Sequence, residues 1–154
     1  MFNFIKKWLL GKPRAPLVEP AVRLNVTFET TLEVDLDAHP AGDELAEFLI
    51  AEFRARQIEL INDPNNEDYA LVLRFGSKSE PLMLLAYVGD EPFQWMIQIN
   101  SGKFFDRPDP RCGELALVLH EILVGNSAFS EIRWHIGDFV EPDWTSTPVK
   151  PPAK

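Results

Sequence analysis

Apolar and polar residues alternate between Val22 and Asp37, and this pattern predicts a β-strand. All even positions except Thr30 are apolar, whereas all odd positions are polar and become acidic toward Asp37. Because successive side chains of a strand point to opposite faces, one face is predicted to pack on a core and the other to lie in solvent. A break into two strands near Thr30 and Thr31 is the alternative, because the segment is long for a strand. The solvent face would hold four acidic residues together, Glu29, Glu33, Asp35 and Asp37.

Helical spacing of apolar residues over 45–61 predicts a helix after this strand. His39 and Pro40 open it, since proline suits the first turn of a helix, and residues 62–64 predict its end. The segment 82–88 is a nearly continuous apolar run, typical of a strand buried on both faces, and 93–100 alternates as its hairpin partner. Strands are thus predicted over residues 69–75, 82–88 and 93–100.

A second helix is predicted from Asp109, as its N-cap, and Pro110, at the first helical position, to Gly125. This helix is apolar nearly all round, so it is either central or covered by a second surface. The sequence therefore leaves room for a homodimer. A last short strand is predicted over residues 132–136.

The predicted order of elements is strand, helix, three strands, helix, strand. This order favours an α+β fold, with a largely antiparallel sheet of about five strands and two helices on one face. Ferredoxin-like packing with an added strand is one candidate topology, by analogy. Residues 21–140 form this single domain. A short amphipathic helix and a Pro-rich linker precede it over residues 1–20, and a Pro-rich tail, ordered only if Trp144 pins it, follows over 141–154.

The charge of the chain is strongly negative and unevenly distributed. The formal charge is −9, yet residues 1–18 carry +4, so the remaining 24 acidic and 11 basic residues give −13. Phosphate backbones repel such a domain, so no nucleic acid partner is expected. A basic surface of another protein would be attracted, although acidity can also serve solubility alone. The single cysteine excludes an intrachain disulfide framework and is typical of a cytoplasmic protein.

The N-terminal segment Met1–Leu10 combines apolar and basic residues at helical spacing. It is too short to span a bilayer, but a segment of this kind can lie in the interface of an anionic membrane. Alternatively, it docks on its own domain or on a partner. The residues predicted to contact a membrane are Phe2, Ile5, Lys6, Lys7, Trp8 and Leu9.

Cys112 lies near the N-terminus of the second predicted helix, where the helix dipole can lower the pKa of a thiol. His120 is about 12 Å further along the same helix and cannot activate it, so only His39 or His135 could, through tertiary packing. Val124 stands where a zinc-protease motif that begins at His120 needs its second histidine. We therefore assign no catalytic residue and expect no metal and no cofactor.

Aromatic and acidic residues lie close together in the predicted loop 100–107, which holds Phe104, Phe105 and Asp106, and at the helix start that follows it, Asp109. Aromatic side chains are favoured anchors of protein interfaces. Together with the acidic face of the first strand, this loop predicts a small acidic, non-enzymatic protein-binding module of bacterial type. Its concrete form would be an inhibitor or immunity protein for a basic toxin. The alternatives are a membrane-peripheral accessory protein held by residues 1–10 and an enzyme with an unrecognised site near Cys112.

Overall fold

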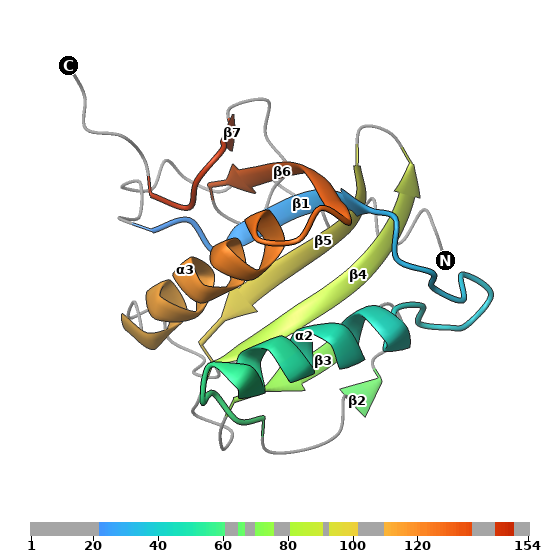
Figure 1. The fold of residues 1–154 in the computed structure, drawn as a ribbon, viewed down its shortest axis with the longest axis horizontal. Helices are drawn as coiled ribbons and strands as arrows, with labels where there is room; N and C mark the ends of the chain where they lie inside the picture. The colour runs from blue at the N-terminus through green and yellow to red at the C-terminus, as the bar shows by residue number, and fades with distance from the viewer. Residues whose placement is uncertain are drawn as a thin grey trace.

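An antiparallel sheet of seven strands, with two helices on one face, makes up the described part of the chain (Figure 1). The computed structural model describes residues 22–60, 65–66, 70–75, 81–90, 93–101, 110–136 and 144–149. The helices are α2 (Asp43–Ala55) and α3 (Pro110–Val124). The strands are β1 (Asn25–Thr30), β2 (Asn65–Asn66), β3 (Leu71–Arg74), β4 (Leu82–Asp90), β5 (Phe93–Asn100), β6 (Phe129–His135) and β7 (Trp144–Thr145).

β1 lies at the centre of the sheet, between β5 and β6, in the order β2-β3-β4-β5-β1-β6-β7. Since β5 and β6 both run antiparallel to β1, they are parallel to each other, and α3 makes the crossover between them. This split β-α-β arrangement is found in ferredoxin-like packing, and the added strand lies in the meander β3–β4–β5. The predicted α+β fold with both helices on one face is confirmed. The two-residue strands β2 and β7 extend the sheet beyond the five predicted strands.

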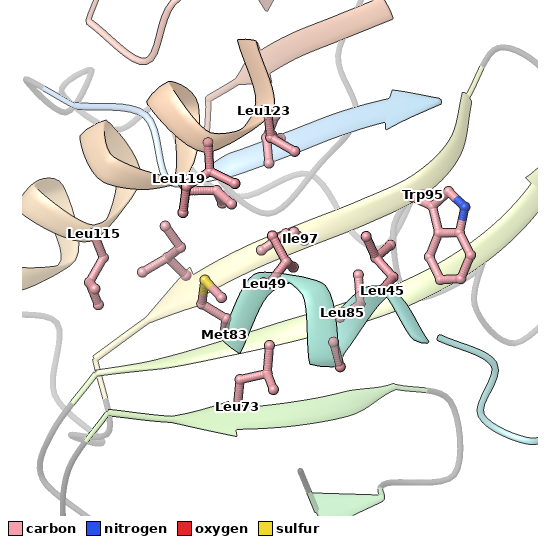
Figure 2. Packing of buried hydrophobic residues seen from close by; sticks show 14 of the residues in the cluster. Leu45, Leu49, Leu73, Met83, Leu85, Trp95, Ile97, Leu115, Leu119 and Leu123 are labelled. Carbon is pink, nitrogen blue, oxygen red and sulfur yellow. The ribbon is translucent and has the colours of Figure 1, made fainter. Parts of the chain in front are cut away.

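Apolar side chains from the sheet and from both helices form the core. Val26 and Phe28 of β1 point into it and are fully buried, as the alternation predicts. Burying a side chain of this size contributes about 1.5–3 kcal/mol relative to leaving it exposed. Figure 2 shows how leucines of the two helices pack on the sheet, with Leu45 and Leu49 from α2 and Leu115, Leu119 and Leu123 from α3 over Leu73, Met83, Leu85, Trp95 and Ile97.

α2 begins later than the sequence predicts. The helix starts at Asp43 rather than in the turn at Pro40. Gly42 precedes it with a φ of 124°, and a Cβ there would lie 3.1 Å from the indole ring of Trp95. Glycine is suited to this left-handed backbone and this close approach, so the chain enters α2 in a geometry that periodicity alone does not reveal.

α2 also ends earlier than predicted, at Ala55. Gln57 adopts a left-handed φ of 64°, and the N–H of Ile58 donates to the carbonyl of Phe53 at 2.9 Å. These features define a Schellman motif, which closes a helix and often brings apolar residues at its two ends together. Leu60 is buried in the core although it lies beyond the helix. The prediction that the helix extends to residue 61 is therefore wrong. The left-handed cap ends the helix, although apolar residues continue at helical spacing in the sequence.

β1 ends at Thr30, so the predicted continuous strand to Asp37 is wrong. The chain does break near Thr30 and Thr31, but residues 31–37 form a loop rather than the second strand of the alternative prediction. The pairing of β1 with β6 shifts register between Thr27 and Glu29. On the partner strand, Glu131 adopts a left-handed φ of 52°. A bulge of this kind bends a strand and interrupts its ladder. The extra residue lies on β6, and the pairing resumes at Glu29 and Thr30, after which the chain forms the loop that leads to α2.

The remaining element boundaries agree closely with the pattern. α3 begins at Pro110 and ends before Gly125, and β5 has its predicted bounds. β3 is shorter than predicted, β4 continues to Asp90, and β6 begins at Phe129 instead of Ile132. The predicted N-cap Asp109, the N-terminal helix and the linker lie outside the described residues.

Candidate functional site

The face of the sheet opposite the helices carries a row of buried polar side chains, which we call the polar row: Gln98, Asn25, Thr27 and His135. Asn25 of β1 pairs in register with Gln98 of β5 on one side and with His135 of β6 on the other. Thr27 Oγ1 lies 2.8 Å from His135 Nε2. Asn25 is 6% exposed and Thr27 is 1% exposed. The prediction that the odd positions of the stretch 22–37 lie in solvent is therefore wrong at these two residues, and also at Arg23, which is 1% exposed.

Hydrogen bonds offset part of the cost of burying these polar groups. Arg23, which precedes β1 and is also buried, donates from Nη1 to the carbonyl oxygen of Trp134 at 3.1 Å. Asn25 Oδ1, by contrast, has no hydrogen-bond partner in the structure as described, a state that costs about 1–3 kcal/mol for a buried group. Because its side chains have almost no contact with solvent, the polar row belongs to the interior of the protein rather than to a binding surface.

Cys112 is not brought together with His120 or His135. Its side chain is buried in the core on the helix side of the sheet. His135 points to the opposite face, where it contacts Thr27. His120 shares α3 with Cys112 but is too far along it, and its Nδ1 accepts a hydrogen bond from Trp134 Nε1 at 3.1 Å. Neither histidine is placed to activate the thiol, and the described residues include no cluster of side chains that could hold a metal ion.

His120 has an altered proton affinity. Burial lowers the pKa of His120 below its ordinary value of 6.5, and the negative charge of Glu121 opposes this effect in part. The hydrogen bond from Trp134 needs an unprotonated Nδ1, which fits a neutral ring. His120 thus links the sheet to α3 in its neutral form.

Exposed carboxylates gather on the loop after β1 and on the first two turns of α2. The chain contains no lysine or arginine between Arg23 and Arg54. The ion pairs of the described chain use other carboxylates, in Arg54–Glu59, Arg56–Glu52 and Arg133–Glu131. We define the acidic surface as these exposed carboxylates together with Leu36; its members are Glu33, Asp35, Leu36, Asp37, Asp43, Glu44 and Glu47.

One hydrogen bond joins the loop part of the acidic surface to its helix part, and a second lies within the loop. Glu44 Oε1 accepts the backbone N–H of Asp35 at 3.3 Å. Asp35 Oδ1 in turn accepts the backbone N–H of Asp37 at 3.0 Å. Leu36 lies between these two aspartates and is 48% exposed. The loop therefore exposes an apolar side chain between two acidic residues.

The sequence predicted three of the seven residues of this surface. Glu33, Asp35 and Asp37 are exposed as expected, but they lie on a loop rather than on one strand face, and half-buried Glu29 stays on β1. Leu36 was missed because its even position assigned it to the core. The carboxylates of α2 were missed because they resemble an ordinary solvated helix face. The signal that could have found them is the long stretch without a basic residue.

Other predicted contact residues are not tested by the structure. The loop residues Phe104, Phe105, Asp106 and Asp109 and the predicted membrane segment Met1–Leu10 lie outside the described residues. The interface and membrane hypotheses that rest on them stay predictions. Within the described chain, neither helix is long and apolar enough to cross a membrane. Leu117 and Val124 of α3 are exposed, so the predicted homodimer also stays a prediction.

Comparisons of the chain with protein-family models, with curated proteins and with solved structures give no match. The fold and the acidic surface define the class of this protein. It is a small acidic α+β protein that exposes carboxylates on a loop and on the first turns of the helix that follows. Its function has to be argued from its own residues.

Proposed function

We propose that the protein is a small acidic binding module whose partner is another protein with a basic surface. The observation that supports this most is the acidic surface, where Asp35 and Asp37 flank the exposed Leu36 in a stretch without lysine or arginine. Positive groups of a partner would neutralise this charge, and opposite charges accelerate the encounter of two proteins. Leu36 would add an apolar contact within a polar rim, the usual arrangement of an interface.

Part of the acidic surface also stabilises the fold. Asp43 and Glu44 lie in the first turn of α2, where a negative charge interacts with the helix dipole by about 0.3–1 kcal/mol. Asp43 and Glu47, four residues apart, repel each other by on the order of 0.2–0.5 kcal/mol. The side chains of Glu33 and Asp37 have no described polar partner. Their charge is therefore the part of the surface that a partner explains best.

An inhibitor or immunity protein for a basic toxin is the concrete form of this proposal. A nuclease is the natural target, because its cleft must attract the negative phosphates of its substrate. The carboxylates of an acidic surface carry the same negative charge as these phosphates, so the cleft would attract them too. The size and single-domain organisation of the chain suit such a role.

The experiment that tests the proposal compares three immobilised proteins in an extract of the source organism. They are the wild type, the variant E33Q/D35N/D37N, and the control E59Q/E114Q/E121Q, which removes the same charge from exposed positions elsewhere. The amide at position 35 can still accept the N–H of Asp37, so the loop keeps its hydrogen bond. Because both variants lose three negative charges, a difference between them depends on where the charge is removed and not on the net charge.

We expect the wild type and the control to capture the same basic protein and the acidic-surface variant to lose it. Capture should also slow as salt rises, because screening weakens long-range attraction. If the neighbouring gene encodes a basic toxin, its product is the first candidate for purified binding measurements. Equal capture by all three proteins, or capture by none, would contradict the proposal.

A further inference from the structure

The face of the sheet opposite α2 and α3, which we call the second face, is buried beyond the polar row. Residues that pair across antiparallel strands share a face, so the register carries the row of Gln98 onto β4 and β3. The row through Thr27 continues in the same way over β5 and β4. The apolar side chains that these two rows add, which we call the apolar patch, are Val72, Leu84, Ala86 and Met96.

The apolar patch has little contact with solvent. Val72 is 3% exposed, Ala86 is fully buried and Met96 is 2% exposed. These side chains do not belong to the core cluster that the two helices share with the sheet. Both helices lie on the other face (Figure 1), and all described strands belong to the one sheet. Burial requires atoms that exclude water, so the second face has a cover that the described helices and strands do not supply.

The described ends of the chain segments that could form this cover limit where each can go. Residues 102–109 join β5 to α3 and therefore have to pass to the helix side. Residues 137–143 join β6 to β7, whose pairing fixes both ends at the sheet edge, two strands or more from the apolar patch. Residues 150–154 contain no aromatic or branched aliphatic side chain. None of these three segments suits the apolar patch.

The segment Met1–Leu10 suits it in reach, length and chemistry. Residues 11–21 join it to Val22, beside the central strand β1, and this linker extends up to about 36 Å. A helix of this segment is about 15 Å long, enough to cross β3, β4 and β5, because neighbouring strands lie about 4.8 Å apart. Its apolar residues recur at the spacing that gives a helix one apolar side.

We propose that the second face is the docking surface of the N-terminal segment Met1–Leu10, which packs its apolar side on the apolar patch. Sheet and helices then form three layers, with helices on both faces of the sheet. The aromatic and aliphatic side chains that would otherwise enter a membrane interface are buried on the sheet instead. The proposal rests on the second face and not on the acidic surface, so it stands independently of the proposed function.

Two methionines of the full chain serve as probe and folding control. Met96 lies in the apolar patch, whereas Met83 is fully buried in the core between the sheet and the helices. Hydrogen peroxide converts methionine to its sulfoxide, and the rate follows the exposure of the thioether. Mass spectrometry of peptides gives both rates in one sample. Exposure of the second face alone therefore speeds oxidation of Met96, whereas unfolding speeds that of both.

Two variants with the same change of net charge test the segment. The first, I5D/W8D, puts carboxylates on its apolar side, where burial is costly. The control, N3D/K7Q, lowers the charge equally on the opposite side of the helix. We expect slow oxidation of Met96 in the wild type and in the control and severalfold faster oxidation in the first variant. The milder variant W8A should show the same selectivity, and it decides the outcome if the first variant unfolds.

Equal protection of Met96 in the wild type and in both variants of the apolar side would overturn the proposal. Exposure of Met96 by F104A/F105A instead would also overturn it, because it would assign the cover to the residues before α3. Protection that is lost when the wild type is diluted would overturn it too, since the cover would then come from a second copy.

Discussion

Two groups of polar residues from one alternating stretch of sequence have opposite environments. Asn25 and Thr27 are buried in the polar row at the centre of the sheet, whereas Glu33, Asp35 and Asp37 are exposed on the acidic surface. Parity along a strand decides which face a side chain takes, and it does so correctly for the first group, which lies on β1, whereas the second group lies on the loop beyond the strand. Whether that face meets solvent depends on the rest of the molecule, which parity does not describe.

The two groups differ in side-chain chemistry, and this difference separates the buried odd positions from the exposed ones. Amide and hydroxyl side chains can be buried at a modest cost if they form hydrogen bonds, as Thr27 does with His135. Carboxylates are far more costly to bury. In the sequence the first acidic odd position is Glu29, one residue before β1 ends, and three of the four odd positions that follow are acidic. The comparison therefore predicts large stability effects inside the sheet and small ones on the loop.

The largest expected effect is at Phe28, which lies in the core and forms an edge-to-face contact with Phe129. F28A should lower the free energy of unfolding by about 3–5 kcal/mol, because it leaves a cavity in addition to the lost burial. Chemical denaturation followed by fluorescence measures this. The control L36A, at an exposed even position of the same stretch, should change stability by less than about 0.5 kcal/mol. Equal losses in both variants would show that the core is wrongly placed.

A smaller effect is expected in the polar row. T27V keeps the shape of the side chain but leaves His135 Nε2 without its hydroxyl partner. The free energy of unfolding should fall by about 1–3 kcal/mol, the cost of an unsatisfied buried polar group. T31V, at an exposed threonine just beyond β1, is the matched control and should be near neutral. An unchanged stability in T27V would mean that this hydrogen bond is not formed.

The pH dependence at His120 tests the link between the sheet and α3. Because the pKa of His120 is lowered in the folded state, the unfolded chain binds the proton more strongly. Stability should therefore fall as pH decreases below 6.5 toward the lower folded pKa, and level off beneath it. Unfolding free energies measured across this range should show a shallower fall in H120Q than in the wild type. Identical profiles would contradict the role given to His120.

The smallest effect on stability is expected on the acidic surface. E33Q/D35N/D37N removes like charges from an exposed loop and keeps the hydrogen bond at position 35. Its free energy of unfolding should stay within about 0.5 kcal/mol of the wild type, as is usual for surface substitutions. Thermal unfolding at low salt, where surface repulsion is least screened, gives the sharpest comparison. A loss as large as that of T27V would show that these carboxylates stabilise the fold.

Most of the fold was predictable from the sequence, because strand alternation and helical periodicity are local signals. The bounds of β5 and α3 follow from Phe93–Asn100 and from Pro110 and Gly125. The ends of α2 were not predictable, since Gly42 and Gln57 adopt left-handed backbone that the apolar pattern does not encode. The candidate site was predictable at three of its seven residues. Acidic side chains could be assigned to solvent, but the exposure of Leu36 depends on where β1 leaves the sheet.

The central claim is that the acidic surface binds a partner and that the fold does not depend on it. The most direct test measures partner capture and unfolding free energy on the same preparations of wild type, E33Q/D35N/D37N and E59Q/E114Q/E121Q. We predict that capture is lost only in the acidic-surface variant, while all three proteins have the same stability within about 0.5 kcal/mol. Capture that survives in the acidic-surface variant, or that falls only in step with its stability, would contradict the claim.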